Sequence, residues 1–313
     1  MRRLPGPPGS AWRKLPEERK SNAGSKPWHA VVMFREIVLC APYNRSGERT
    51  EYKISDRFSF MLFLDLGLGD KVPDAKTVWL YWDQRAQAGT IEALFEDLDG
   101  YLEKEGYLVM GSQIIDASIV AILEQQNSCD ENANIKEGET PEGWDSKPAK
   151  RSQKDTDARW TKKHGKSHYG HKNHVNIDRR HKPARRYKVT DATAHDSPVV
   201  EGILHPNNMP SDVWTDSAYR SADIESKLAE KGLKIQIHRN KPLTGREIQG
   251  NKTRSKARPR VEHVFGAQSN YMGGTLVRSI GLARAKARIG LNNLACNMRR
   301  LVQLERLAIA GSP

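Results

Sequence analysis

The hydrophobic periodicity of this chain changes near residue 106, and the change limits the folds that it can adopt. From 28 to 106 the apolar residues recur at spacings of three and four, which predicts amphipathic helices. The apolar face of one such helix consists of Leu94, Phe95, Leu98 and Leu102. From 107 onward, short apolar runs typical of buried strands alternate with helical segments, and a basic helix over about 283–308 closes the chain. This order of elements predicts an α/β fold, a mixed sheet with helices on its faces, after a small all-helical region.

Composition divides the chain further. Residues 1–27 are rich in Pro, Gly, Ser and Arg without any helical or strand period, which predicts a flexible N-terminal lead. We then expect a helical domain over 28–106 and an α/β domain over 107–313. Within the latter, an acidic and then basic stretch predicts a surface insertion around 121–168. Alternating polar and apolar residues within 147–188 predict an antiparallel pair of strands.

The charge balance points to a polyanionic partner. Lys and Arg number 51 against 38 Asp and Glu, which gives a net charge of +13. A positive charge of this size most often indicates a protein that binds nucleic acid. A basic enzyme without such a partner is the alternative. No uninterrupted apolar run is long enough to span a bilayer, and the three cysteines form no CxxC pair. We therefore expect a cytoplasmic protein that does not insert into a membrane.

Three acidic residues stand out by their surroundings. Asp116 ends the apolar run SQIID, Asp216 ends DVWTD, and Glu262 lies in a helical segment among basic residues. A carboxylate at the end of a buried strand is costly unless a partner stabilises it, and ligands bind at the strand ends of α/β sheets. If the three converge, they form an anionic, oxygen-rich site suited to Mg²⁺.

Each acid also has a simpler interpretation. Asp116 and Asp216 are able to cap the turn or helix that follows them. Glu262 is able to form an ordinary ion pair with Arg258, one helical turn earlier. Spacing alone does not decide between these interpretations and a shared site.

Two basic segments are candidates for contacts with DNA phosphates. The first lies between the two strands of the predicted antiparallel pair and contains Arg179, Arg180, Arg185 and Arg186. The second is a run in which every second residue is basic, and its candidates are Arg254, Lys256, Arg258 and Arg260. A merely solvated basic surface is the alternative for both.

Four histidines within eleven residues have a spacing that resembles a zinc site, namely His164, His168, His171 and His174. Because no cysteine accompanies them and lysines lie among them, a face that contacts phosphates is the better interpretation. Four aromatic residues, Trp28, Trp79, Trp82 and Phe95, fit a helical core better than a base-stacking surface.

Three segments, QIIDASIV, WTDSAYRS and RPRVEHVFGAQ, resemble in this order the three catalytic blocks of DDE insertion-sequence transposases. The likeness is to insertion-sequence family five, within the ribonuclease H-like superfamily. The segments EYKISDRFSFMLFLDLGL and PDAKTVWLYWDQ resemble the N-terminal region of that family, and IGLNNLACNMRRLVQLERLA resembles its C-terminus. The resemblance covers residues 26 to the end and implies a ribonuclease H-like mixed five-stranded sheet flanked by helices.

This resemblance implies a definite chemistry. Asp116, Asp216 and Glu262 match the catalytic acids, which would hold two Mg²⁺ (or Mn²⁺) ions and cut and join DNA strands by phosphoryl transfer. The helical region 28–106 would bind DNA, and the partners would be double-stranded DNA at the terminal inverted repeats and at the target. A homodimer in the synaptic complex and a bacterial, nucleoid-associated location follow from the same resemblance.

The sequence departs from the Tyr-Arg-Glu-Lys signature of the family at two places. Arg258 matches its arginine, but Ser255 stands where the tyrosine is usual and Ser269 where the lysine is usual. Tyr219 and Arg220 match the block after the second aspartate, where positioning of that ligand and simple packing are both possible roles. A DNA-binding remnant or repressor that does not cut, or a simple metal-dependent nuclease, are the alternative functions.

Overall fold

The computed structural model describes most of the chain beyond its N-terminal segment. The described residues are 27–43, 47–122, 125–163, 165–205, 207–219, 221–237, 245, 249, 259–272 and 276–310. No helix in this part of the chain combines the length and apolarity needed to cross a membrane.

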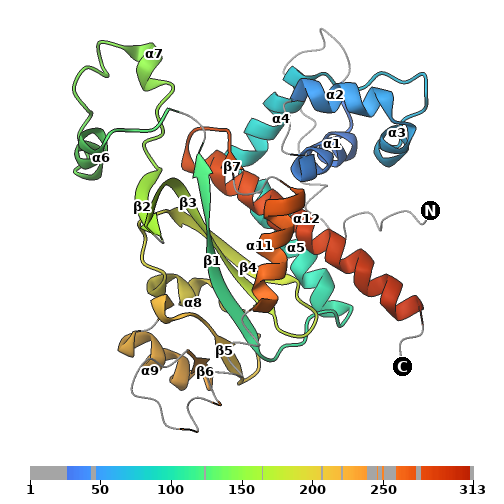
Figure 1. Cartoon of the computed structure of the whole chain (residues 1–313). Helices are drawn as coiled ribbons and strands as arrows, with labels where there is room; N and C mark the ends of the chain where they lie inside the picture. The colour runs from blue at the N-terminus through green and yellow to red at the C-terminus, as the bar shows by residue number, and fades with distance from the viewer. Residues whose placement is uncertain are drawn as a thin grey trace.

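A mixed sheet forms the centre of the fold (Figure 1). Its strands are β1 (Gln113–Ile122), β2 (Arg159–Lys163), β3 (Lys166–Asp178), β4 (Ala184–Asp191), β5 (Asp212–Trp214), β6 (Lys234–Gln236) and β7 (Leu276–Val277). The strand order is β2-β3-β1-β5-β6, with β4 also paired to β3 and β7 to β1. β3 is antiparallel to β1, β2 and β4, whereas β5 is parallel to β1 and to β6. The predicted mixed sheet flanked by helices and the antiparallel pair are confirmed. The predicted count of five strands is wrong, because the described sheet has seven strands, among them the short strands β2 and β7.

Among the described residues, five helices precede the sheet, as the periodicity of residues 28–106 predicts. They are α1 (Ala30–Tyr43), α2 (Gly47–Asp56), α3 (Phe58–Leu64), α4 (Ala75–Gln87) and α5 (Thr90–Lys104). Phe95 is buried and Trp28 and Trp82 are partly buried against the same core, but Trp79 is 54% exposed. The prediction that Trp79 belongs to the core is therefore wrong, because it faces away from the helices that α4 packs against.

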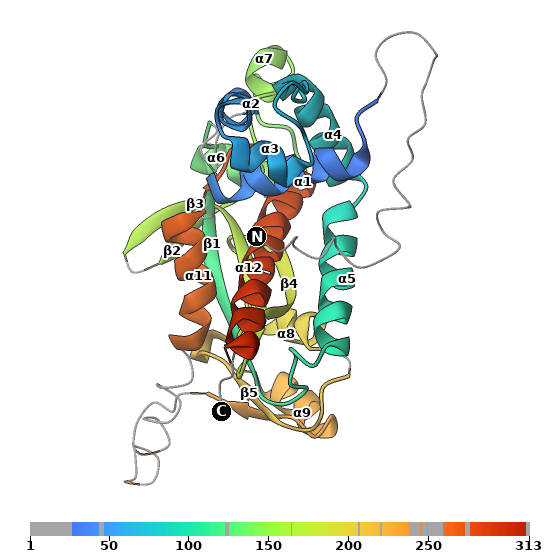
Figure 2. The same ribbon diagram turned by 90° about the vertical axis from the view of Figure 1, so that its right-hand side faces the viewer.

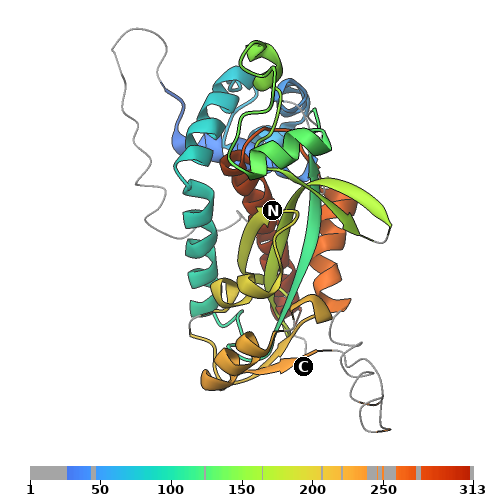
Figure 3. The same cartoon turned by 90° about the vertical axis from the view of Figure 1, so that its left-hand side faces the viewer.

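Later helices cover both faces of the sheet. They are α8 (Val200–Ile203), α9 (Ala222–Glu230), α11 (Pro259–Tyr271) and α12 (Leu282–Ile309), with short 3-10 turns at Ser197–Val199 and Ser217–Tyr219. α12 lies between α11 and α5 on one face, as Figures 2 and 3 show from opposite sides. On the other face, Ile115 and Val213 pack against apolar residues of α8 and α9. The basic C-terminal helix is confirmed at almost the predicted bounds.

The insertion between β1 and β2 contains α6 (Cys129–Lys136) and α7 (Pro148–Arg151), apart from the N-terminal helices in Figure 1. Ser128 and Glu131 form a capping box at the start of α6. The Glu131 carboxylate also accepts hydrogen bonds from Trp144, Lys150 and Lys154. These bonds hold the pKa of Glu131 well below its usual range, against the effect of burial. One carboxylate thus organises the acidic and basic halves of the predicted insertion around itself.

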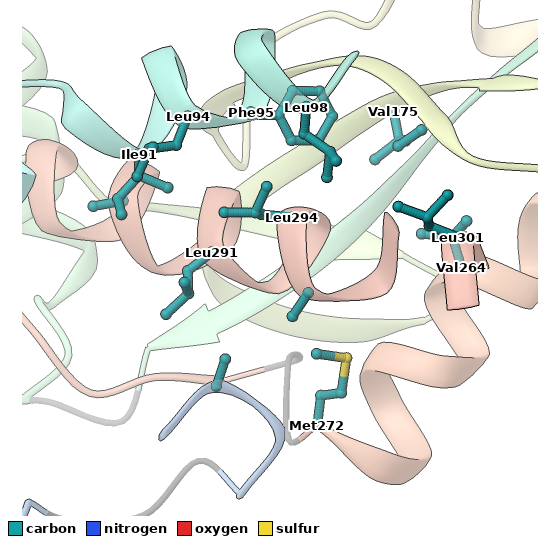
Figure 4. Close-up of a cluster of buried hydrophobic side chains, with 14 of the residues drawn as sticks. Ile91, Leu94, Phe95, Leu98, Val175, Val264, Met272, Leu291, Leu294 and Leu301 are labelled. Atoms are coloured by element: carbon teal, nitrogen blue, oxygen red, sulfur yellow. The ribbon is translucent and has the colours of Figure 1, made fainter. Parts of the chain in front are cut away.

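A single core joins the N-terminal helices to the sheet. Leu98 of α5 lies opposite Leu294 of α12 (Figure 4). Leu94 of α5, Leu291 of α12 and Val175 of β3 belong to the same cluster. This cluster also contains α1, α4 and α11 residues. The division at residue 106 therefore stays a prediction about function, because the side chains on its two sides are buried together.

Gly290 of α12 packs closely against Tyr187 of β4. The ring of Tyr187 packs edge-on against Phe95 of α5, with 4.8 Å between ring centroids. A Cβ at position 290 would meet the Tyr187 hydroxyl closer than any real Cβ contact, and would also touch Ile91 at 3.2 Å. A glycine is thus required at 290 by lack of space.

We predict that Gly290→Ala destabilises the protein. Overpacking costs about 1–3 kcal/mol, which outweighs the gain of about 1 kcal/mol from the better helix propensity of alanine. Urea unfolding followed by circular dichroism measures the change. Tyr187→Phe removes a buried hydroxyl that has no hydrogen-bond partner among the described residues, and it should restore part of the stability of Gly290→Ala. Restoration is partial because the ring carbon Cζ, 2.9 Å from the added Cβ, remains in place. Equal stability of Gly290→Ala and wild type would contradict this interpretation.

The carboxyl group of Glu36 on α1 is buried, which is unfavourable for its charged form. Burial, and then the nearby charges of Glu51 and Asp74, raise the pKa of Glu36 from 4.5 to about 8. Glu51 is held there by the backbone N–H of Ala75 at 2.9 Å, and Asp74 caps α4 through Thr77. Glu36 is therefore protonated in the folded protein at neutral pH.

Stability should consequently fall as the pH rises between 4.5 and about 8, because within this window the folded state holds a proton that the unfolded state has released. Glu36→Gln, which mimics the protonated form, should reduce this fall and raise the melting temperature most at the upper end of the window. Thermal unfolding of wild type and Glu36→Gln across these pH values measures how the stability of each depends on pH. A wild type and variant with parallel pH profiles would refute the assignment.

Candidate active site

Asp116 and Asp216 lie on neighbouring parallel strands in matching positions. The pairs in register between β1 and β5 are Gln113 with Val213 and Ile114 with Trp214. Both pairs differ by 100 in residue number, as do the two aspartates, which lie two residues beyond the second pair. The ladder continues after β5, because the N–H of Thr215 donates to the carbonyl of Gln236 at 3.3 Å. Adjacent strands are about 4.8 Å apart, so the register brings the two aspartates side by side.

The two aspartates share the face of the sheet that α11 and α12 cover. Ile114 and Trp214 belong to the same buried cluster as Val261 and Val264 of α11. Because side chains alternate along a strand, positions 116 and 216 lie on the side of Ile114 and Trp214 rather than on that of Ile115. This side is the one on which α11 carries Glu262.

The expectation that both aspartates end a strand holds for one of them. Asp216 lies two residues after β5, whereas Asp116 is within β1, which runs on to Ile122. β1 continues because its second half pairs with β3, as far as Ala121 opposite Gly170. A Cβ at Gly170 would collide with the carbonyl of Val120, so the glycine allows this close pairing. The predicted strand end at Asp116 is therefore wrong.

Backbone groups orient both carboxylates. The N–H of Ala117 donates to Oδ1 of Asp116 at 2.8 Å, and the N–H of Ala218 donates to Oδ1 of Asp216 at 2.9 Å. The capping interpretation of Asp216 thus describes a real bond, which does not prevent a role in a site. The turn that follows Asp216 is itself held in place, because the buried Tyr219 hydroxyl lies within hydrogen-bond distance, 3.3 Å, of Nδ1 of His174. Tyr219 packs in the core, and Arg220 lies outside the described residues.

Glu262 occupies the first turn of α11 and is exposed. Val261 and Val264 anchor this turn in the core, and Nη1 of Arg260 donates to the carbonyl of Arg179 at 2.8 Å. Within the described ranges, no group of three or more His, Cys, Asp or Glu side chains is close enough to hold a metal ion. The carboxylate pair has the donor chemistry that Mg²⁺ prefers, but Glu262 does not complete a closed set of ligands in this conformation.

Arg185 is buried in an ion pair and is not a surface residue. Its guanidinium has no exposed surface and donates to the carboxylate of Asp178, the carbonyl of Val109 and the side chain of Asn208. Asp178 in turn accepts the N–H groups of Val109, Arg180 and His181. The prediction that Arg185 contacts DNA is therefore wrong, because a phosphate cannot reach it.

The other candidate DNA contacts divide into three groups. Arg179, Arg180 and Arg260 line a hollow of about 450 Å³ beside Asp178. Arg180 and Arg260 are exposed, while Arg179 is half-buried with its guanidinium 4.8 Å from the ring centre of Trp214. Arg186 is also half-buried, and its charge acts on the buried Asp99 of α5. Ser255 and the predicted contacts Arg254, Lys256 and Arg258 lie outside the described residues.

Two of the four clustered histidines are buried within the sheet. His171 and His174 have no exposed surface, and Nε2 of His174 lies 3.0 Å from the Thr190 hydroxyl. Burial lowers the pKa of His174 to about 4, against the charge of Asp196 and with that of Lys172. The prediction that these two contact phosphates is wrong, and His164 lies outside the described residues.

Sequence reasoning missed the importance of Asp178. The sequence does contain an indication of this residue, because Asp178 ends the alternating run HVNID just as Asp216 ends DVWTD. The arginines that follow it favour the prediction of a charged surface, although one of them, Arg185, is the partner of the buried Asp178.

The candidate site combines two aspartates aligned on neighbouring parallel strands with a hollow lined by arginines at the start of β1, an arrangement suited to an enzyme that acts on a polyanion. A family model described as "Transposase DDE domain" matches residues 114–298, more than half of the chain, and another described as "Transposase domain (DUF772)" matches residues 9–84. The chain therefore belongs to the DDE transposase family. Both matched aspartates and Glu262 lie within the first of these ranges.

A solved structure is also similar in part. The crystal structure of the Mos1 strand transfer complex matches with a TM-score of 0.26 and 9% identity, over 90% of this chain and 81% of that one. Likeness at this level supports no conclusion about function.

The buried ion pair makes a testable contribution to stability. Arg185→Met leaves Asp178 as a buried charge without its cation, so we predict a loss of about 3–5 kcal/mol in the free energy of unfolding. Urea unfolding measures this loss. Arg180→Met, at an exposed neighbouring position, is the matched control and should change stability by less than about 0.5 kcal/mol. Similar small changes for both variants would show that the pair is not structural.

Proposed function

We propose that this transposase cleaves DNA strands at the ends of an insertion sequence and transfers them to target DNA, with Asp116, Asp216 and Glu262 as its catalytic acids. The observation that carries the proposal is the register of β1 and β5, which aligns the two aspartates on the face that α11 covers. The order of the three matching blocks in the sequence supports a member of insertion-sequence family five.

Divalent cations, two Mg²⁺ or Mn²⁺ ions, would be held by the three carboxylates. When bound, such ions generate a nucleophile from water and stabilise the leaving oxygen during in-line displacement at phosphorus. The backbone N–H groups of Ala117 and Ala218 orient the two aspartates before any ion binds. Because Glu262 is exposed while its neighbours Val261 and Val264 are buried, its side chain is able to reorient toward the pair without disturbing the packing of α11.

The DNA would lie along the cationic surface at this end of the sheet. Arg179, Arg180 and Arg260 surround the hollow next to Asp178, and Arg260 is two residues from Glu262. Phosphate contacts of this kind position the duplex without reading its sequence. We further propose that Arg254, Lys256 and Arg258 extend this surface, and that Arg186 contributes its charge at the margin.

Recognition of the terminal inverted repeats would fall to the helical region 28–106, as a DNA-binding domain, and the residues 107–313 would form the catalytic domain. Synapsis of two ends with target DNA would require a homodimer, in a bacterial, nucleoid-associated setting. The shared core of α5 and α12 supports a rigid relation between the two functions.

A DNA-binding remnant that does not cut is the second candidate function. The observation in its favour is that the described residues contain no closed group of three metal-binding side chains. The two candidates differ in strand cleavage and not in DNA binding.

Mixing the purified full-length protein with Mg²⁺ and a duplex that bears the inverted repeats of the element separates these functions. We expect nicking and joining of 3′ ends by wild type, and a loss of at least on the order of 100-fold for Asp116→Asn, Asp216→Asn and Glu262→Gln, since these remove direct metal ligands. DNA binding without metal should persist in all three. Asp223→Asn on α9, an exposed acid paired with Lys227, is the control and should retain activity.

Wild type that binds the duplex but nicks it no faster than Asp216→Asn would overturn the enzymatic proposal in favour of the remnant. Cutting without preference for the element ends, and without joining, would indicate a simple metal-dependent nuclease instead.

A further inference from the structure

We propose that a second cationic hollow, between α11, α12 and the turn after β3, binds a phosphate of the DNA backbone on the flank of Glu262. It is lined by Lys182, Glu262, His263, Arg299, Arg300 and Gln303, among others, and has a volume of about 390 Å³. This inference rests on the proposed function and adds a DNA-binding site to it.

Hydrogen bonds hold the turn that carries Lys182 firmly against α12. Nε of Arg300 donates to the carbonyl of His181 at 2.6 Å. The side chain of Asn297 accepts from the N–H of Ala184 at 2.7 Å and donates to its carbonyl at 2.6 Å. Lys182 lies between these two attachment points, so the position of its backbone relative to the hollow is fixed.

The backbone at Lys182 is itself unusual. Its φ of 68° lies in the left-handed region, which a lysine seldom adopts. A lysine at this position costs conformational energy that asparagine or glycine would reduce, and the chain nevertheless carries a long cationic side chain here. Strain of this kind is found where function requires the residue.

The charges around the hollow are unbalanced. Lys182, Arg299 and Arg300 are opposed by the single carboxylate of Glu262 among the described lining residues. Three cations around one carboxylate leave a positive field in the hollow, which an anion would relieve.

The features of the hollow favour a nucleic-acid backbone over a free nucleotide. The described residues that line it include no Phe, Tyr or Trp on which a base would stack. The hollow also shares its turn with the one next to Asp178, since Arg179 and Arg180 line that hollow and Lys182 lines this one. Two cationic hollows along one turn suit the repeated charges of a strand better than a single small anion.

The salt dependence of DNA binding tests the proposal with the full-length protein and a fluorescein-labelled duplex in EDTA. Lys182→Asn combined with Arg299→Gln removes two cations, and asparagine tolerates the left-handed backbone. We expect the slope of log Kobs against log salt to become shallower by about 1.8, which corresponds to two phosphate contacts at about 0.9 each. Arg300 is left intact because it holds the turn.

Lys136→Gln is the matched control, because Lys136 is exposed on α6 in the distant insertion (Figure 1). Its slope should equal that of wild type. Urea unfolding of the double variant should show no loss of stability, which separates a lost contact from a misfolded protein. A slope unchanged from wild type in the folded double variant would overturn the proposal, and so would an equal change in Lys136→Gln.

The experiments distinguish a failure of the proposed function from a failure of this proposed DNA-binding site. If the double variant shows the shallower slope while wild type does not cleave DNA with Mg²⁺, the hollow binds DNA in a protein that is not an active transposase. If wild type cleaves and the double variant has the wild-type slope, the function stands and this site is refuted.

Discussion

The buried pair of Asp178 and Arg185 joins the segments that lead into β1 and β5, the two strands whose register aligns Asp116 with Asp216. Asp178 closes the turn between β3 and β4, and Arg185 reaches from β4 to the carbonyl of Val109, just before β1, and to Asn208, just before β5. Three separate parts of the chain thus meet at one pair of charges. Because both partners are buried and surrounded by hydrogen bonds, the pair fixes their relative positions more strictly than apolar packing would.

The second constraint is the sharing of α5 and α12 between the N-terminal helices and the sheet. α12 contributes to the cluster that contains residues of α1, α4, α5 and α11, so the helices that precede the sheet pack against a helix that follows it. The requirement for Gly290 opposite Tyr187 shows how closely α12 approaches β4. An N-terminal part that binds DNA would therefore transmit its orientation to the catalytic face through packed side chains and not through a linker.

Most of the fold follows from the hydrophobic pattern, since period and element order are local properties. The helices over 28–106, the antiparallel pair and the C-terminal helix are in the expected places. Errors arose where a side chain's environment depends on distant partners. Arg185 and His174 have the composition of a basic surface but pair with Asp178 and Tyr219, and Asp116 sits within a strand because β3 extends the pairing. The alignment of Asp116 with Asp216 depends on strand register, which no spacing in the sequence reveals.

That register has a consequence for how activity would be lost. β5 has only three residues, and two of them set the pairing that places Asp216 beside Asp116. A slip of one residue would turn Asp216 to the opposite face, where Ile115 and Val213 pack against α8 and α9. The same slip would turn Trp214 out of the large core and Val213 out of the cluster on the other face, so the packing on both faces of β5 opposes it. Substitutions that weaken the packing of this three-residue strand would thus reduce activity and stability together.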